Sequence, residues 1–188
     1  GGGANSTGGR GKALCIVNTL TWDTPLTYHA ASGSDAKYYT GGFKAALTTS
    51  NVGYIVFDVS GNIVMPTNGT AVGNWNGLIG VNQKTVFGQS APKGGITMTG
   101  GTFSFDGGDN GEDSNDLIFR YLRSRPRIGR DGVFDPSSDD AQTWAFKFYG
   151  GKNIIVDHCS ASFGNDKAMG GYIDNDKGNQ VMEDWTFS

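Results

Sequence analysis

The segment Asn153-Ile-Ile-Val-Asp-His-Cys-Ser160 has three counterparts elsewhere in the chain. Each begins at an Asn and continues into a short run of mainly apolar residues, and the other three start at Asn82, Asn115 and Asn179. The intervals between the four Asn residues are 33, 38 and 26 residues. Asn suits a turn because it tolerates left-handed backbone angles. The spacing predicts a repeat whose units are joined by loops of variable length.

A repeat of this kind favours an all-β fold, a right-handed single-stranded parallel β-helix. In such a solenoid no coil can bury its apolar face alone, so each coil stacks its side chains on those of the coil below. The alternative is an antiparallel sandwich, which would have tight hairpins and regular turns every 8–12 residues. The Asn-Gly pairs at 68–69 and 110–111 lie inside longer polar segments instead. We therefore expect the β-helix.

Glycine dominates the composition of the 188-residue chain. It accounts for 31 residues, whereas Pro accounts for 5, and a typical protein has about 7% Gly. There is no strict every-third Gly, which excludes a collagen-like chain. Long helices are excluded as well, because Gly in a helix interior costs about 1 kcal/mol relative to Ala. A single turn-rich β domain remains.

The charge balance bears on the possible partners. Lys and Arg total 15, Asp and Glu total 18, and the net charge is −3. No global positive field is available to hold a phosphate backbone, so we expect no nucleic-acid partner. The longest apolar run, Tyr54–Phe57, is far too short for membrane insertion, and no signal peptide opens this chain. We expect Cys15 and Cys159 to be free thiols, with a disulfide between them as the alternative.

The chain reads as one domain, residues 1–188. Residues 1–50 are expected to form an amino-terminal loop, a strand and a short helix within Asp35–Ser50, and residues 51–188 the β-helix coils. The runs with strand character are Ala13–Leu20, Tyr54–Val59, Asn62–Met65, Gly77–Val81, Lys84–Phe87, Ile96–Thr99, Leu117–Leu122, Trp144–Tyr149, Asn153–Cys159 and Val181–Phe187.

Six motifs in the same order resemble the pectate lyases, specifically polysaccharide lyase family 1 in its bacterial and fungal branch. They are Thr7–Lys12, Val17–Leu20, Tyr54–Ile63, Lys84–Pro92 with the following Gly94–Ile96, Asp116–Arg125 and Asn153–Ser162. Each motif is weak alone, and the shared order along almost the whole chain carries the resemblance.

The resemblance implies a secreted or extracellular enzyme. Its reaction would be a calcium-assisted β-elimination on an acidic, uronic-acid-containing polysaccharide such as polygalacturonate. Family sequences continue for several coils past the strand at Val181–Ser188, so the chain resembles an amino-terminal fragment truncated at its C-terminal end. The usual Arg base is then expected beyond Ser188, and the fragment alone is expected to be inactive. The open coil end would be covered by the missing C-terminal half or by an assembly partner.

The metal ligands that the resemblance implies are Asp139, Asp140 and Asp166. Asp139 and Asp140 precede the strand at Trp144–Tyr149, a few residues earlier than the family's Asp. Asp166 matches the acidic residue after the Asp-His-Cys-Ser motif, where Lys167 stands in place of the family's frequent Glu. Carboxylate oxygens are the ligands that Ca²⁺ prefers. The alternatives are a solvated turn for the first pair and a surface ion pair with Lys167 for Asp166.

Candidate substrate-binding residues are Arg123, Arg125 and Lys167. Strand alternation puts Arg123 and Arg125 on one face, opposite Ser124. A guanidinium binds a carboxylate in a bidentate manner. The alternative is that these arginines form salt bridges with Asp113, Asp116, Asp131 or Asp135.

Asp157 and His158 resemble a catalytic pair, yet their position in a strand favours structural hydrogen bonds. With two histidines in all, His29 and His158, a zinc site with several His ligands is excluded.

Two functions compete with the lyase. One is a non-catalytic extracellular β-helix that binds carbohydrate or serves as a structural module. The other is a glycoside hydrolase on the same scaffold, which needs two carboxylates about 5–10 Å apart. Asp139, Asp140 and Asp166 could supply those carboxylates, but the ordered motifs resemble lyases.

Overall fold

The computed structural model describes residues 1–65, 78–106, 114–126, 144–164, 166–173 and 181–188. These residues form three sheets and one short helix, α1 (Phe43–Thr48), with single 3₁₀ turns η1 (Gly2–Asn5) and η2 (Gly88–Ser90). None of the helices in the described ranges is long and apolar enough to cross a membrane.

The strands divide among the three sheets. The first sheet has the order β16 (Met182–Phe187), β13 (Gly151–Asp157), β10 (Leu117–Arg120), β7 (Lys84–Phe87), β4 (Val52–Phe57), β1 (Ala13–Val17), β3 (Tyr38–Gly41) and β2 (Thr27–His29). The second sheet has the order β14 (Ser160–Ala161), β11 (Arg123–Pro126), β8 (Ile96–Gly100) and β5 (Gly61–Met65). The third has the order β15 (Lys167–Tyr172), β12 (Trp144–Tyr149), β9 (Phe103–Asp106) and β6 (Leu78–Ile79).

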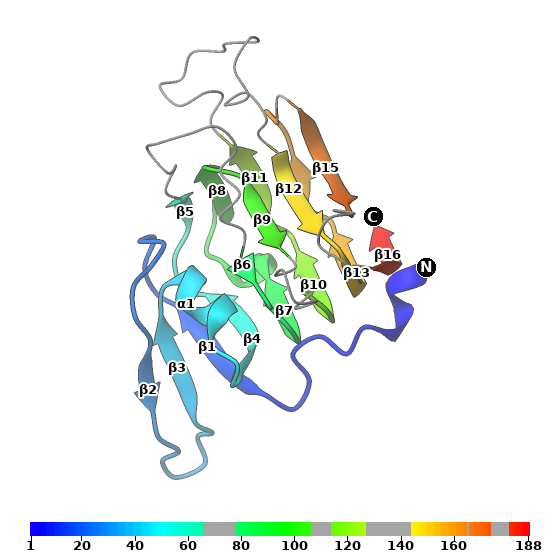
Figure 1. Cartoon of the computed structure of the whole chain (residues 1–188). Coiled ribbons are helices and arrows are strands. Elements are labelled where there is room, and N and C mark those ends of the chain that lie inside the picture. The colour runs from blue at the N-terminus through cyan, green and yellow to red at the C-terminus, as the bar shows by residue number, and fades with distance from the viewer. Residues whose placement is uncertain (66–77, 107–113, 127–143, 165, 174–180) are drawn as a thin grey trace.

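The chain visits the sheets in turn. From β4 onward each strand of the first sheet is followed by one in the second and one in the third, and the cycle then restarts one position further along (Figure 1). Every described strand pair is parallel except the β2–β3 hairpin. The prediction of an all-β chain with parallel strands is confirmed. The antiparallel sandwich is wrong for the described strands.

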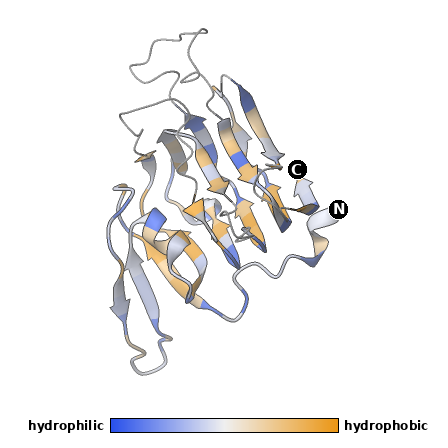
Figure 2. Cartoon of the chain, viewed as in Figure 1, coloured by the Kyte–Doolittle hydropathy of each residue, from blue (hydrophilic) through white to orange (hydrophobic). Residues whose placement is uncertain are grey.

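A column of phenylalanines fills the space between the sheets. Phe103 and Phe105 of β9 lie beside Phe146 and Phe148 of β12, with ring centroids 5.5 and 5.4 Å apart, and Phe119 of β10 closes the column at 4.9 Å from Phe105. All five are essentially buried, and each burial stabilises the fold by about 1.5–3 kcal/mol. Figure 2 shows the same concentration of apolar residues on the stacked strands and a paler β2–β3 hairpin.

Four strands of the first sheet carry a left-handed residue, which directly precedes β7 and β10 and lies within β13 and β16. Gln83, Asp116, Asn153 and Asp184 have φ between 55° and 58°, and the strand register aligns these four positions. The preceding residues form a ladder across three coils. The amide of Asn115 donates to Asn82 Oδ1 at 2.8 Å, and the amide of Lys152 donates to Asn115 Oδ1 at 2.8 Å.

This ladder corrects the predicted repeat. Asn82 and Asn115 are equivalent, as expected, but Asn153 lies one residue later in its coil and Lys152 holds the equivalent position. Asn179 lies outside the described residues. The repeated element is therefore the left-handed turn, which Asn, Asp or Gln can occupy.

Several predicted elements match and others need correction. Lys84–Phe87 and Trp144–Tyr149 form strands with the predicted bounds. The run Leu117–Leu122 breaks after Arg120, because Tyr121 takes a left-handed backbone (φ 56°) that turns the chain into the second sheet. The short helix expected within Asp35–Ser50 is confirmed as α1, and the earlier part of that segment, Tyr38–Gly41, pairs with β1 as strand β3.

The glycine-rich opening, Gly1–Lys12, lies across the outer face of the first sheet; we call it the N-terminal strap. The amide of Gly9 donates to Thr85 Oγ1 at 2.9 Å, and the amide of Gly3 donates to Thr186 Oγ1 at 2.9 Å. The strap thus runs from the first coil to β16, and Figure 1 shows both termini at the same end. A Cβ on Gly9 would lie 2.0 Å from the carbonyl oxygen of Gly53, so close approach requires glycine here.

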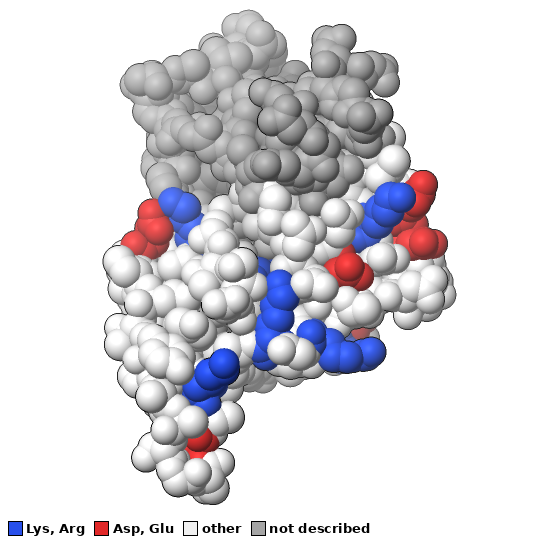
Figure 3. Space-filling view, turned by 60° about the horizontal axis from the view of Figure 1, so that its bottom comes forward, with Lys and Arg blue, Asp and Glu red and all other residues white. Residues whose placement is uncertain are grey.

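The cysteines and charges agree with the sequence-based expectation. Cys15 is buried, Cys159 is half-buried, and both are free, so the disulfide alternative is wrong. On the face that Figure 3 presents, basic and acidic side chains form small separate groups between uncharged areas.

Candidate functional site

The outer face of the second sheet carries the predicted arginines. In β11 the side chains of Arg123 and Arg125 lie outward and half-buried, whereas Ser124 is buried. The predicted alternation is therefore confirmed. The register aligns outward residues into two rows across the strands. The first row is Asn62, Thr97, Arg123 and Ser160, and the second is Val64, Thr99 and Arg125.

Within the described residues, both guanidinium groups contact neutral partners. Arg123 Nε donates to Thr97 Oγ1 at 2.8 Å, and Arg123 Nη2 donates to the carbonyl of Gly94. Arg125 Nη1 donates to the carbonyls of Ser160 and Ser124 at 2.7 and 2.9 Å, and Nη2 donates to Ser160 Oγ at 2.7 Å. These bonds fix the two cations in place without cancelling their charge.

Neither arginine forms a salt bridge within the described residues, and three of the four predicted partners, Asp113, Asp131 and Asp135, lie outside them. The arginine ion pair there joins Arg120 to Asp157, 2.6 Å apart, and Asp116 accepts instead from the amide of Thr7 at 3.2 Å. A fixed guanidinium beside neutral groups is suited to a carboxylate ligand. The outer face of the second sheet can therefore bind an anion.

Asp166 and Lys167 lie together at the start of β15. Lys167 Nζ is 2.9 and 3.1 Å from the two carboxylate oxygens of Asp166, and Trp144 Nε1 donates to Asp166 Oδ2 at 2.7 Å. The ammonium also lies 4.5 Å from the centre of the Trp144 ring. The surface ion pair considered as the alternative for Asp166 is thus present.

The described residues do not fit a calcium site. They contain no group of three or more His, Cys, Asp or Glu side chains that could hold a metal ion. Asp166 is the predicted ligand among them, and both its oxygens already accept from nitrogen donors. Asp139 and Asp140 lie outside the described residues, so their predicted metal role stays a prediction.

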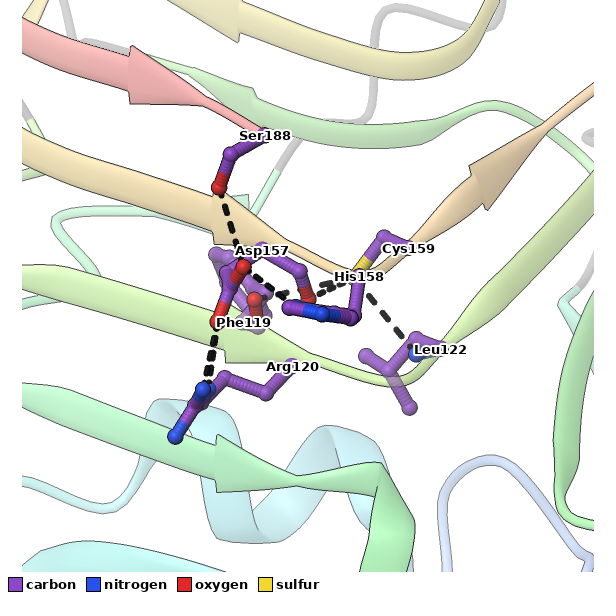
Figure 4. Close-up of polar contacts among 7 residues, drawn as sticks. All are labelled: Phe119, Arg120, Leu122, Asp157, His158, Cys159 and Ser188. Atoms are coloured by element: carbon purple, nitrogen blue, oxygen red, sulfur yellow. Dashed lines mark hydrogen bonds and ion pairs between the residues drawn. The ribbon is translucent and has the colours of Figure 1, made fainter.

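Asp157 connects three coils at the corner between the first and second sheets (Figure 4). It accepts from Ser188 Oγ at 2.9 Å, pairs with His158 Nδ1 at 2.5 Å, and accepts from Arg120 Nε at 2.7 Å. The hydrogen bond from Ser188, followed by those from His158 and Arg120, lowers the pKa of Asp157 against the opposing effect of desolvation. His158 also stacks on Tyr121, with centroids 4.9 Å apart.

These contacts agree with the expected structural role of Asp157 and His158. Sequence reasoning missed Arg120 and Ser188 as partners. For Arg120 the signal was its position in the strand, because Arg120 and Asp157 are directly paired in the register of β10 and β13.

An open pocket of about 780 Å³ lies beside β5 and was missed by the sequence analysis. Its described lining residues are Asn18, Thr19, Leu20, Thr21, Trp22, Asp23, Val59 and Val64. The sequence signal that could have indicated it is the segment Thr19–Asp23, which places a tryptophan among polar residues shortly after a strand.

Comparison with curated proteins gives a consistent set of relatives. The chain is 32% identical over 181 residues to a probable pectate lyase C of Aspergillus oryzae, and 32% identical over 167 residues to that of Emericella nidulans. It is 29% identical over 181 residues to that of Aspergillus fumigatus. These matches cover 96%, 89% and 96% of this chain.

The same matches cover 33%, 30% and 33% of the relatives. The chain thus spans about a third of the length of the curated relatives it matches. No protein-family model matches the chain. The chain has a pectate-lyase-like relationship to these proteins.

Proposed function

We propose that this chain is part of a secreted polysaccharide lyase of family 1, built on a right-handed parallel β-helix, that cleaves an acidic polysaccharide such as polygalacturonate. The relatives named pectate lyase, matched over most of the chain, support the lyase chemistry. The three parallel sheets that the chain visits in turn are what a β-helix requires.

The observation that carries the proposal for this chain is the outer face of the second sheet. Arg123 and Arg125 lie there with neutral partners, and both are proposed to bind uronate carboxylates. Lys167 is proposed as a further contact, although its ammonium pairs with Asp166. A polyuronate carries one carboxylate per sugar unit, so a face with fixed cations suits it.

In a β-elimination, a base removes the proton at C5 of the uronate, the C4–O bond breaks, and an unsaturated sugar end remains. The proton is weakly acidic because its loss puts charge beside an existing carboxylate. Cationic donors held on that carboxylate therefore stabilise the developing charge. The described residues are assigned binding roles, and the base is assigned to none of them.

Calcium remains part of the proposal through Asp139 and Asp140. Asp166 would have to lose its bonds to Trp144 and Lys167 before it could join them as a ligand. Chelation tests this part separately: loss of polygalacturonate binding or cleavage in the chelator would support calcium, and unchanged binding and cleavage would contradict it.

The main experiment measures two quantities with polygalacturonate. Binding is measured for the chain and for Arg125→Gln, with the exposed Lys37→Gln as the matched control. We expect weaker binding for Arg125→Gln alone, by about tenfold, as for loss of one charge-assisted contact. Equal binding by both variants would contradict the assigned face.

Ultraviolet absorbance of unsaturated uronides is the second quantity, followed for this chain and for a longer form wherever the sequence continues beyond Ser188. An absorbance rise from either form supports the lyase. Binding by both forms without any rise supports the second candidate, a non-catalytic carbohydrate-binding module. That candidate is favoured by the lack of an assigned base among the described residues. The absence of both binding and product contradicts both functions.

A further inference from the structure

The loop Asn18–Asp23, which follows β1 and lines the pocket beside β5, is fixed by several contacts. The amide of Lys44 donates to the carbonyl of Trp22 at 3.0 Å. The Trp22 ring packs edge-on against the buried Phe43, with centroids 6.1 Å apart. The amide of Thr21 donates to Thr19 Oγ1 at 3.1 Å, which holds the turn. A pocket held in this way loses little freedom when a ligand binds.

The lining combines an apolar wall with neutral polar groups. Leu20, Trp22, Val59 and Val64 form the wall, and Asn18, Thr19 and Thr21 add hydroxyl and amide groups. An aromatic ring with a few polar groups is the usual lining of a small-molecule pocket. The same combination suits a sugar ring, which has an apolar C–H face and hydroxyls at its rim.

The electrostatics of the pocket disfavour a free carboxylate. None of its described lining residues is a Lys or Arg. The one charged residue among them, Asp23, is acidic and pairs with Lys44 Nζ at 2.7 Å. Among the described lining residues a polyuronate carboxylate would face Asp23, whose cation Lys44 is already paired, whereas an uncharged sugar unit avoids this repulsion.

The pocket is continuous with the arginine face. Val64 lines the pocket and is also the first member of the row that continues through Thr99 to Arg125. Neighbouring strands lie about 4.8 Å apart, so the β5 end of this row is about 10 Å from β11. A glycan that crosses the strands along this row reaches the pocket at its β5 end.

We propose that this pocket is a subsite for an uncharged pyranose unit of the same polysaccharide whose uronate units bind at Arg123 and Arg125. This inference rests on the proposed function and extends it to the substrate class. The chain then recognises a mixed glycan with charged units over β11 and an uncharged unit beside Trp22. The uncharged unit is either a methyl-esterified uronate or a neutral sugar.

The test compares binding of three oligosaccharides of equal length by calorimetry. They are a fully de-esterified galacturonan, a partly methyl-esterified galacturonan, and a galacturonan that ends in neutral galactose units. We expect Trp22→Ala to weaken binding of the second or the third by about tenfold, as for loss of an aromatic contact, and to leave the first unchanged. Trp22→Phe should restore most of the loss, and Tyr28→Ala, at an exposed aromatic outside the pocket lining, should change nothing.

A second variant keeps the test valid if Trp22→Ala disturbs the packing on Phe43. Val64 is 62% exposed, so Val64→Lys is tolerated sterically and puts a cation in the pocket. It should reverse the preference, strengthening binding of the de-esterified galacturonan and weakening binding of the ligand with the uncharged unit. The ligand that responds to both variants identifies which uncharged unit is bound.

The inference is overturned if neither Trp22→Ala nor Val64→Lys changes the ratio of affinities between the charged and the mixed oligosaccharides. A failure of the proposed function looks different. In that case the de-esterified galacturonan does not bind and Arg125→Gln has no effect, whatever the effect of Trp22→Ala on the other two oligosaccharides.

Discussion

Lys84 is a buried cation held by backbone carbonyls. It is 1% exposed, and Nζ donates to the carbonyl of Thr49 at 2.7 Å and to that of Val52, which joins the end of α1 to β4. Burial, with a smaller effect from the charge of Lys12, lowers the pKa of Lys84 to about 8. Above pH 8 the unfolded chain therefore holds more protons on this group than the folded chain does.

We expect the stability of the protein to rise between pH 8 and pH 9, by at most about 1.4 kcal/mol per pH unit. Above pH 9 the effect is opposed by Cys15, because burial raises the pKa of its thiol to about 11. Urea unfolding at several pH values measures the slope. Lys84→Met should abolish it, and the exposed Lys37→Met should retain it. An unchanged slope in Lys84→Met would contradict the assignment.

Asp157 gives a pH dependence of the same sign as Lys84, but in the acid range. The hydrogen bond from Ser188, together with those from His158 and Arg120, lowers the pKa of its carboxyl in the folded protein. The stability that this supplies is present above the ordinary pKa and is lost as the pH falls through the lowered one. Asp157→Asn should therefore be less stable than the wild type at pH 7, with the difference shrinking below about pH 4.

Thermal unfolding between pH 3 and pH 7 measures this difference. Asp58→Asn, at an exposed site next to β4, is the control and should follow the wild type. A difference that is the same at pH 3 and pH 7 would mean that the ionised carboxylate of Asp157 is not what stabilises this corner.

At the scale of elements, the asparagine ladder connects the residues before β7 and β10, Asn82 and Asn115, to Lys152 near the start of β13. Asn115 is its middle member, since its amide donates to Asn82 and its Oδ1 accepts from the amide of Lys152. Asn115→Ala leaves the Lys152 amide without this acceptor and should lower the free energy of unfolding by about 1–2 kcal/mol. Asn115→Asp keeps the acceptor and should lose less.

Chemical denaturation of both variants checks the ladder, with Asn62→Ala on the exposed face of β5 as the control. If Asn115→Ala and Asn62→Ala lose the same free energy, the ladder contributes nothing specific.

The strands of the coils were largely predictable because their inward residues are apolar and β-branched. Lys84–Phe87 and Trp144–Tyr149 illustrate this. The break inside Leu117–Leu122 was not predictable, since Tyr121 has no intrinsic preference for a left-handed backbone and takes it from its place at the corner. The offset of Asn153 was not predictable either. Several residue types can occupy the left-handed position, so an Asn in the sequence does not show which position of the coil it takes.

In the candidate site as well, local features were predictable and contacts between distant segments were not. The common face of Arg123 and Arg125 followed from period-two alternation, which is local. The pocket at Trp22 did not, because it brings the loop after β1 against Val59 and Val64. The pairing of Asp166 with Trp144 joins residues 22 positions apart in neighbouring strands and was likewise a matter of register.

For the whole molecule, the N-terminal strap connects the first coil to the last described strand. Its glycine content identified it as irregular, and the absence of apolar periodicity predicted a loop. The path across the first sheet was not predictable from either feature. Gly9 and Gly53 contact each other through their backbones, since a Cβ on Gly53 would lie 2.3 Å from the carbonyl oxygen of Gly9. Close approach therefore explains these two glycines better than turn geometry does.

Gly9→Ala tests whether the strap holds the stack together. The new methyl group would lie 2.0 Å from the carbonyl oxygen of Gly53 and 2.1 Å from its carbonyl carbon. These are backbone atoms, which cannot move aside as a side chain could. The strap must then lift, which breaks the bond from Gly9 to Thr85 and weakens that from Gly3 to Thr186. We expect a loss of about 2–4 kcal/mol in unfolding free energy and faster hydrogen exchange at the strap amides.

Arg10→Ala, at an exposed position of the strap, serves as the control and should leave both quantities unchanged. Exchange should also rise in β16, at the other end of the sequence, because η1 packs against that strand. A rise confined to the first coil would show that the strap does not couple the two ends. Unchanged exchange at Gly3 and Gly9 would mean that the strap is not seated on the sheet, and the close contacts at these glycines would then need another explanation.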